Sequence, residues 1–332
     1  MPALSALNPT LLDLAKVTDP NGTIAQVVEL LETQNEILTD MTWVEGNLQT
    51  GHRTSVRTGL PSSTWRKMYG GVQPSKSRSA QITDNCGMLE AYAEVDKALA
   101  DLNGNTAAFR LSEDVSFLQS MNQTMASTLF YGNEGTQPEA FTGLAPRFNS
   151  LSAENADNII TGGGISTDNA SIWLVGWGPN SCHGIIPKGS TAGLQTKDLG
   201  EVTIENVDGA GGRMQGYRTH YRWDAGLSVR DWRYVVRICN IDKSSLTMDA
   251  SAGAYLTDLM VQAVERIENL SMCRPIFYMN RRLRTFLRRQ IINKTVQSSL
   301  TQETMAGKSV TMFDGIPVRR TDALAADEAL VS

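Results

Sequence analysis

Apolar residues recur at helical spacing in the first half of the chain. Near the N-terminus Thr23 can cap a helix, because apolar residues follow at positions 24, 27, 28, 31 and 38. A second helix of about 20 residues, roughly 30 Å long, is predicted to begin with Ser112 as its N-cap. It is predicted to end at Gly132. Its apolar stripe consists of Val115, Leu118, Met121, Met125 and Leu129.

Two more helices are predicted in the second half. One runs from about Ala252 to Met272, and the other follows Asn280, which can cap it. The buried face of the first consists of Leu256, Leu259, Met260, Ala263, Val264, Ile267 and Leu270. The second is rich in arginine, and its apolar face consists of Leu283, Phe286, Leu287 and Ile291. That face predicts that the arginine-rich helix is anchored to a core.

Residues 172–241 show the alternation of β-strands. In "GYRTHYRWD" aromatic residues and Thr219 alternate with arginines and His220, and "WRYVVRICNI" places Arg233 and Arg237 on the polar side. "PIFYM" at 275–279 is typical of a buried strand. "VTMFDGIPVRR" predicts a β-hairpin whose turn is Asp314-Gly315. Helices and strands together indicate an α+β protein.

Charge is unevenly distributed along the 332 residues, whose formal net charge is −5. Residues 1–45 contain seven acids and one base, whereas residues 46–82 contain six bases and no acid. Adjacent segments of opposite charge favour complementary surfaces within or between chains, although two solvated faces fit the pattern equally. The basic segment is rich in Gly, Ser and Thr. We expect a long excursion there, two-stranded in part, with short extended pieces around Val56 and Trp65–Tyr69.

Little in the sequence points to chemistry, and we expect no catalytic residue, cofactor or metal site. The three histidines, His52, His183 and His220, have no metal-ligand spacing, and no two of the four cysteines form a C-x-x-C pair. "AGKS" at 306–309 lacks the first glycine of a P-loop, because Gln302 stands in that position. A pI near 5.4 argues against a dedicated nucleic-acid binder. The apolar runs are too short to span a bilayer, so we expect a reduced, soluble, intracellular protein with no membrane partner.

The order of these elements resembles the major capsid protein of tailed bacteriophages, the Hong Kong 97 fold. Within that group the resemblance is greatest to short-tailed phages such as the Bordetella tropism-switching phage. The stretches that carry it are "LPSSTWRKMYGGVQPSKS", "MLEAYAEVDKALADL", "LFYGNEGTQPEAFTGLAPRF", "SIWLVGWGPNSCHGIIPKGSTAGL", "YVVRICNID", "PIFYMNRRLRTFLRRQ" and "FDGIPVRRTDAL". They span most of residues 40–325 in the same order.

The resemblance implies a division of the chain into the parts of that fold. These are an N-terminal arm (1–45), an extended loop (46–82), a peripheral domain with a long spine helix (83–165), an axial domain with a β-rich insertion (166–305) and a C-terminal hairpin returning to the core (306–332). The resemblance also implies hexamers and pentamers that form an icosahedral shell around double-stranded DNA.

The implied partners are other copies of the chain, the scaffolding, portal and possibly cement proteins of the phage, and packaged DNA held without sequence preference. The implied location is the virion, after assembly in the host cytoplasm. Some family members cross-link lysine to asparagine with a buried glutamate as base. Lys67 and Lys76 lie in the basic loop, but no asparagine or glutamate partner maps onto a motif, so no such chemistry is assigned. Three alternatives remain: an encapsulin-like shell protein, a nucleic-acid-binding structural protein, and an enzyme with an unrecognised site.

Contacts between subunits are the predicted functional surfaces. The candidates are Arg53, Arg57, Trp65, Arg66 and Lys67 in the loop, Glu29, Glu32 and Glu36 in the arm, and Arg281, Arg284 and Arg288 on one flank of the arginine-rich helix. Arg282 and Arg289 lie on its other flank. A solvated basic face and a DNA contact are the alternatives for this helix. We favour acids of the next subunit as partners, with Asp258, Glu265 and Glu268 as candidates.

Overall fold

The structure is a computed structural model that describes residues 35–102, 106–205, 211–247, 253–293, 300–305 and 308–332. Its contacts divide the chain into two compact units. Among the described residues, unit 1 consists of Met88–Met125 and Thr191–Asp224, and unit 2 contains the rest. The boundary between the units falls within β3, α4 and β8.

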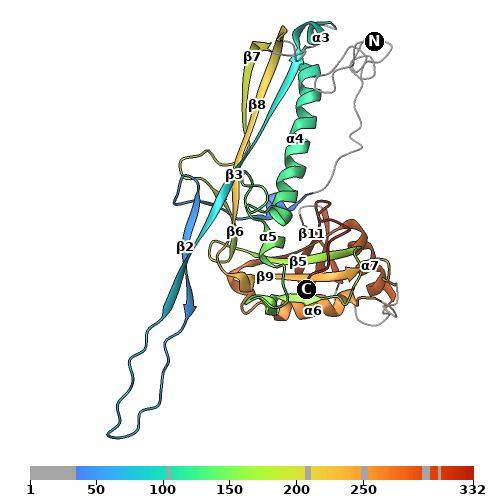
Figure 1. Ribbon diagram of the computed structural model, residues 1–332. Coiled ribbons are helices and arrows are strands. Elements are labelled where there is room, and N and C mark those ends of the chain that lie inside the picture. Colours follow the sequence, from blue (N-terminus) through green and yellow to red (C-terminus); the bar gives the residue numbers. More distant parts are fainter. Residues whose placement is uncertain (1–34, 103–105, 206–210, 248–252, 294–299, 306–307) are drawn as a thin grey trace. The chain divides into compact units, whose positions relative to one another are not determined.

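The chain combines helices and strands, of which the long helix α4 and the long strands β3 and β8 stand out (Figure 1). The helices are α2 (Ile37–Asp40), α3 (Lys97–Asp101), α4 (Thr106–Tyr131), α5 (Leu144–Arg147), α6 (Leu256–Glu265) and α7 (Arg281–Asn293). The first strands are β1 (Trp43–Glu45), β2 (Gly51–Gly59), β3 (Arg78–Asp96), β4 (Ile159–Thr161), β5 (Asn169–Trp177), β6 (Cys182–Ile186) and β7 (Gln195–Glu205). The others are β8 (Arg213–Val229), β9 (Val235–Asp242), β10 (Arg274–Met279), β11 (Leu300–Met305), β12 (Lys308–Phe313) and β13 (Ile316–Arg320).

Unit 1 combines strands β7, β8 and β3 with most of α4. The predicted alternation appears in the middle of β8: Thr219 and Tyr221 are buried, whereas Arg218, His220 and Arg222 next to them are half-buried. Tyr221 packs with Ala93 of β3 and Met121 of α4. The polar side of the same strands is neutralised internally, since Arg218 pairs with Glu94 at 2.6 Å. Hydrophobic side chains therefore face the helix, and charged pairs cover the other face.

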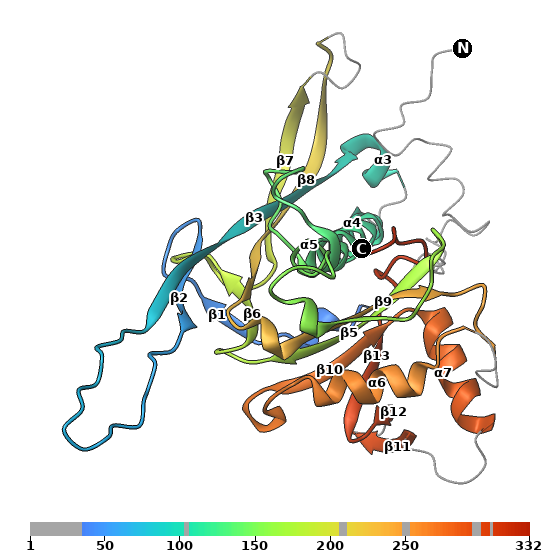
Figure 2. The same cartoon turned by 60° about the horizontal axis from the view of Figure 1, so that its bottom comes forward.

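Unit 2 has its main core around the strands β10, β5 and β9. β10 is antiparallel to β5 and parallel to β13, and β5 is antiparallel to β9. In Figure 2 α6 and α7 lie beside these strands. Leu256 and Met260 of α6 and Leu283 and Leu287 of α7 join Phe277 in one buried cluster. The apolar faces predicted for both helices are thus the ones that pack.

Strands β2 and β3 form a two-stranded extension of unit 2. They are antiparallel, with Gly51 opposite Asn85 and Gly59 opposite Arg78. Residues 60–77 connect them without a strand or helix. The extended piece expected at Trp65–Tyr69 is wrong: Tyr69 lies in a turn with a φ of 61°. No neighbouring strand pairs with this stretch in the described part of the chain, so no ladder holds it extended.

The long helix starts earlier than the sequence predicted. α4 begins at Thr106, so Ser112 is an interior residue and not the N-cap. Phe109, three per cent exposed, packs with Val95 and Leu99, and this burial extends the helix beyond its expected start. Val115 of the predicted stripe is 39% exposed. The end at Gly132 is confirmed, because its amide donates to the Thr128 carbonyl at 2.8 Å.

The predicted helix from Ala252 to Met272 is also shorter in the structure. α6 ends at Glu265, and a separate 3₁₀ turn covers Leu270–Met272. The Asn269 side chain accepts a hydrogen bond from the Ser271 amide at 3.0 Å. This local side-chain bond competes with continuation of the helix.

The arginine-rich helix and the terminal hairpin are confirmed. The Asn280 side chain accepts from the Leu283 amide at 2.8 Å, which is the predicted N-cap of α7. β12 and β13 pair through Asp314 and Gly315, whose φ angles of 50° and 75° are those of a type I′ turn. The helix predicted at Thr23 lies almost wholly outside the described residues. The domain division drawn from the sequence stays a prediction.

Candidate functional site

The tip of the extension exposes large side chains. Trp65, Met68 and Tyr69 are 103%, 89% and 106% exposed, and Leu60 is 81% exposed. The Gly70 amide donates to the Lys67 carbonyl at 3.0 Å and closes the turn. The Ser75 hydroxyl donates to the Ser62 carbonyl at 2.8 Å and ties the two sides of the loop together. The structure thus presents the aromatic candidate Trp65 to solvent.

The basic candidates of the loop are also exposed. Arg66 and Lys67 follow Trp65 at the tip, and Arg53 and Arg57 lie on β2. Arg53 makes a hydrogen bond from Nε to the Thr83 hydroxyl at 3.2 Å. In the described part of the chain, no carboxylate forms an ion pair with any of the four. Their charges are therefore available to a partner.

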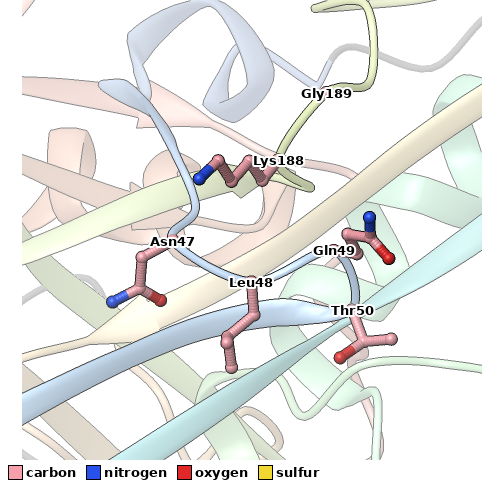
Figure 3. Close-up of a pocket in the computed structure, with 6 residues that line it drawn as sticks. All are labelled: Asn47, Leu48, Gln49, Thr50, Lys188 and Gly189. Atoms are coloured by element: carbon pink, nitrogen blue, oxygen red, sulfur yellow. The ribbon is translucent and has the colours of Figure 1, made fainter.

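A shallow pocket lies at the root of the extension (Figure 3). It is lined by Asn47, Leu48, Gln49, Thr50, Lys188 and Gly189. The Lys188 amide donates to the Leu48 carbonyl at 3.1 Å, which holds the two lining turns together. The pocket places one exposed lysine beside the basic strand β2.

The acidic candidates of the arm are only partly described. Glu29 and Glu32 lie outside the described residues. Glu36 pairs with Arg319 of its own chain, Oε2 to Nη1 at 2.8 Å. One turn later Asp40, three per cent exposed, accepts from Arg274 at 2.9 Å. The described acids at this end of the arm are therefore partnered within the subunit.

Asp40 is also linked to the aromatic core of unit 2. The Tyr278 hydroxyl donates to it at 3.2 Å, and the Trp177 indole donates to Tyr278 at 2.9 Å. Burial, followed by the charge of Asp40, raises the pKa of Tyr278 well above its usual value. The phenol therefore stays protonated and remains a donor to the carboxylate.

The arginines of α7 form one broad exposed face. Arg281, Arg282, Arg288 and Arg289 are exposed, whereas Arg284 is half-buried and donates to the Thr311 hydroxyl at 3.0 Å. Burial, more than its arginine neighbours, lowers the pKa of Arg284. Arg281 pairs with Asp322 at 3.2 Å. Arg284 is therefore less available to a partner than Arg288, its neighbour on the same helix.

The acids suggested as partners of α7 differ in availability. Glu268 is occupied by Arg233 of its own chain at 2.9 Å. Asp258 is exposed and accepts from Gln262 at 2.7 Å, and Glu265 is exposed on α6. Asp258 and Glu265 are thus the two acids of this set that remain available to another subunit.

One buried ion pair was missed by the sequence reasoning. Arg237, predicted on the polar side of its strand, is four per cent exposed and pairs with Glu328 at 2.8 Å. A lone arginine in the apolar run "VVRICNI" is a signal of a buried pair. The partner could not be read from the sequence because it lies 91 residues away.

No three His, Cys, Asp or Glu side chains in the described part of the chain are placed to hold a metal ion. No helix among those residues has the length and apolar character needed to cross a membrane.

Comparisons with known proteins identify the family. Among solved structures, one chain of the bacteriophage epsilon15 structure is 41% identical, with 100% of both chains covered and a TM-score of 0.76. The capsid of a native GTA particle matches 70% of this chain and 99% of its own at 10% identity, with a TM-score of 0.47. An encapsulin complex from Synechococcus elongatus PCC 7942 matches 71% and 97% at 10% identity, with a TM-score of 0.45. The latter two are too distant to support an argument.

No curated protein matches the sequence. The model of the family described as major capsid protein GP7 matches residues 19–332. The predicted fold class is confirmed as a phage capsid fold of the Hong Kong 97 type, while the finer resemblance to the Bordetella phage stays a prediction. The chain belongs to the major capsid protein GP7 family and is a structural protein of a bacteriophage capsid.

Proposed function

We propose that copies of this chain assemble as hexamers and pentamers into a closed icosahedral shell around the double-stranded DNA of a tailed phage. The observation that carries the proposal is the exposure of Trp65, Met68 and Tyr69 at the end of a two-stranded extension. Covering such a side chain contributes roughly 1.5–3 kcal/mol. Large apolar side chains gathered on an exposed loop mark a surface that is covered by a partner. In this proposal the loop tip lies on a neighbouring subunit.

Charge supports the same arrangement. The loop has basic residues on both sides of Trp65, and tryptophan and arginine dominate the energetics of interfaces. Arg53, Arg57, Arg66 and Lys67 are proposed to meet acids of a neighbour, with Glu29 and Glu32 of its arm as candidates. Each exposed pair contributes only about 0–1 kcal/mol, so a wrongly placed subunit can leave. The same pairs recur many times in a shell, so their summed contribution to its stability is large.

The arginine face of α7 is proposed to meet the next subunit around the capsomer. Asp258 and Glu265 are the acids that remain available for it. This face needs acidic partners, because like charges spaced three or four residues apart on one helix repel each other. Packaged DNA needs no specific grip, and tight phosphate binding would oppose its ejection.

The role proposed here is structural and not catalytic. Other copies of the chain are the main partner. Scaffolding, portal and possibly cement proteins are proposed to act with it, and packaged DNA is proposed to contact the shell without sequence preference. Assembly is placed in the host cytoplasm, before release of the virion.

Expression of the chain, alone and with a scaffolding partner, tests the proposal by negative-stain electron microscopy. We expect capsomers, tubes, sheets or closed shells. A variant with Trp65→Ser, Met68→Ser and Tyr69→Ser should fold but give no closed shells. Ile165→Ser is the matched control, because Ile165 is 89% exposed elsewhere in unit 2.

Two outcomes would overturn the proposal. Normal shells from the triple variant would show that the loop tip is not needed for assembly. A chain that stays monomeric at high concentration with scaffold present would show that it does not assemble. Shells purified from the natural source without DNA, but with protein cargo, would favour the encapsulin-like alternative.

A further inference from the structure

Five strands close into a ring at the root of the extension. β1 is parallel to β6, with Trp43 opposite Gly184, and β6 is antiparallel to β8, with His183 opposite Ser228. β8 neighbours β3, and β3 is antiparallel to β2. β1 and β2 are successive pieces of one segment, so the ring closes on itself.

Short backbone bonds hold this closure. The Gly46 amide donates to the Ile186 carbonyl at 2.7 Å, and the Cys86 amide donates to the Thr50 carbonyl at 2.9 Å. Both bonds connect the turn between β1 and β2 to the strands on either side. The extension therefore begins from a closed ring of backbone within unit 2.

The ring encloses polar side chains from four of its strands, β2, β3, β6 and β8. His52 lies opposite Asp84 in the β2–β3 ladder, and the Ser228 hydroxyl donates to Asp84 Oδ2 at 2.7 Å. The rings of His52 and His183 meet edge to face, with centroids 5.8 Å apart. Asp84, His183 and Ser228 are at most three per cent exposed. These four side chains form what we call the ring cluster.

One member of the ring cluster is left unsatisfied. Neither nitrogen of His183 has a hydrogen bond of normal geometry, although its side chain is buried. A buried polar group without a partner is costly, and a charged one is costlier still. His183 is therefore held neutral in the closed ring.

The charges around His183 do not favour its protonation. His52 and Arg230 oppose a positive charge there, while Asp84 and the Gly178 carbonyl favour it. Asp84 is already compensated, because Arg147 pairs with its Oδ1 at 2.8 Å and Ser228 donates to its other oxygen. Burial, followed by the charge of His52, lowers the pKa of His183 to about 4.

We propose that the ring cluster is a proton-sensitive joint: protonation of His183 opens the strand ring and releases the root of the β2–β3 extension. A proton on His183 in the closed ring has no hydrogen-bond acceptor of normal geometry, whereas water solvates the imidazolium once the ring opens. The use of this joint in a shell rests on the proposed function. The joint itself is a property of the single subunit and is tested there.

The direction of the pH effect follows from linkage. The pKa of His183 is about 4 in the closed ring and about 6.5 in an open one. The open form binds more protons between these values, so closure is fully stable above about pH 6.5. It is lost as the pH falls toward about 4, with the opening equilibrium rising up to about tenfold per pH unit.

The proposed joint can be tested by hydrogen exchange of the full-length, unassembled subunit, measured by mass spectrometry from pH 7 to pH 4.5. After correction for intrinsic exchange, protection of residues 51–59 and 78–87 should fall by up to about tenfold per pH unit. Peptides from β10 and α7 should keep their protection. In His183→Leu the root should lose this pH dependence, because leucine cannot take up a proton.

His220→Leu is the control, because His220 lies in unit 1 and contacts Glu90 at 3.3 Å. This variant should keep the pH dependence of the root. Equal pH dependence in wild type and His183→Leu would overturn the proposal, as would root protection that is flat with pH in wild type. Should His183→Leu fail to fold, the His183 imidazole can be titrated by NMR in the wild type, where an apparent pKa near 6.5 refutes the joint. Failure of shell assembly in the loop variants leaves all these results unaffected.

Discussion

The guanidinium of Arg237 donates to the carboxylate of Glu328 at 2.8 Å, with both side chains almost fully buried. Arg237 also donates to the Phe148 carbonyl at 2.7 Å and lies over the Trp173 ring at 5.1 Å from its centroid. The Tyr131 hydroxyl donates to the other oxygen of Glu328 at 2.5 Å. The pair thus fastens the C-terminal segment to β9 and to the end of α4.

Breaking this pair should destabilise unit 2. Glu328→Ala leaves Arg237 buried without its counter-ion, and we expect a loss of about 3–5 kcal/mol in the free energy of unfolding. Burial, followed by Glu328 itself, raises the pKa of Tyr131, so this phenol cannot replace the missing charge. Urea denaturation of the subunit measures the loss.

The double variant Arg237→Met with Glu328→Leu is the control for that experiment. Removing both residues leaves no unpaired charge, although Tyr131 and the Phe148 carbonyl lose a hydrogen-bond partner, so the double variant should be less destabilised than Glu328→Ala. Equal losses in the two variants would show that packing, and not the uncompensated charge, sets the cost.

Reversal of the loop charges should block shell closure without unfolding the subunit. In a variant with Arg53, Arg57, Arg66 and Lys67 all changed to Glu, the exposed side chains lose no partner carboxylate within the described part of their own chain. We expect normal circular dichroism and no closed shells by electron microscopy. The same four positions changed to Gln should give an intermediate yield. Shells of normal number and shape from the Glu variant would refute the charge pairing.

The exposed arginines of α7 should be needed for capsomers. Arg281→Glu with Arg288→Glu changes two exposed positions and leaves the half-buried Arg284 in contact with Thr311. We expect loss of capsomers, measured by size-exclusion chromatography and microscopy. Arg281→Lys with Arg288→Lys keeps the charge and should assemble. Normal shells with impaired DNA filling in the Glu variant would instead favour the DNA contact.

Mature particles should contain no covalent links between subunits. Lys67 and Lys76 are exposed near the loop tip, and no asparagine or glutamate in the sequence matches a cross-linking motif. Boiling in detergent should therefore release a single band near the chain mass of 36.2 kDa. A ladder of larger bands on the gel would contradict this.

Several local features could be predicted because neighbouring residues determine them. Asn280 and the apolar spacing after it predicted α7, since a cap and a buried stripe lie within one turn of each other. Asp314-Gly315 predicted the hairpin, because both residues tolerate the positive φ that a type I′ turn requires. The order of motifs also predicted the capsid family, which the family model confirms. The exposure of the basic loop agrees with its composition.

Tertiary contacts determined the rest. Burial of Phe109 moved the start of α4 upstream, against the local signal of Ser112. Arg237 was predicted from alternation to face solvent, but its partner Glu328 lies 91 residues along the chain. The ring cluster joins His52 and Asp84 to His183 and Ser228 through two separate strand ladders. Local sequence encodes caps, turns and apolar faces, whereas the meeting of distant side chains depends on strand register, which only the folded sheet sets.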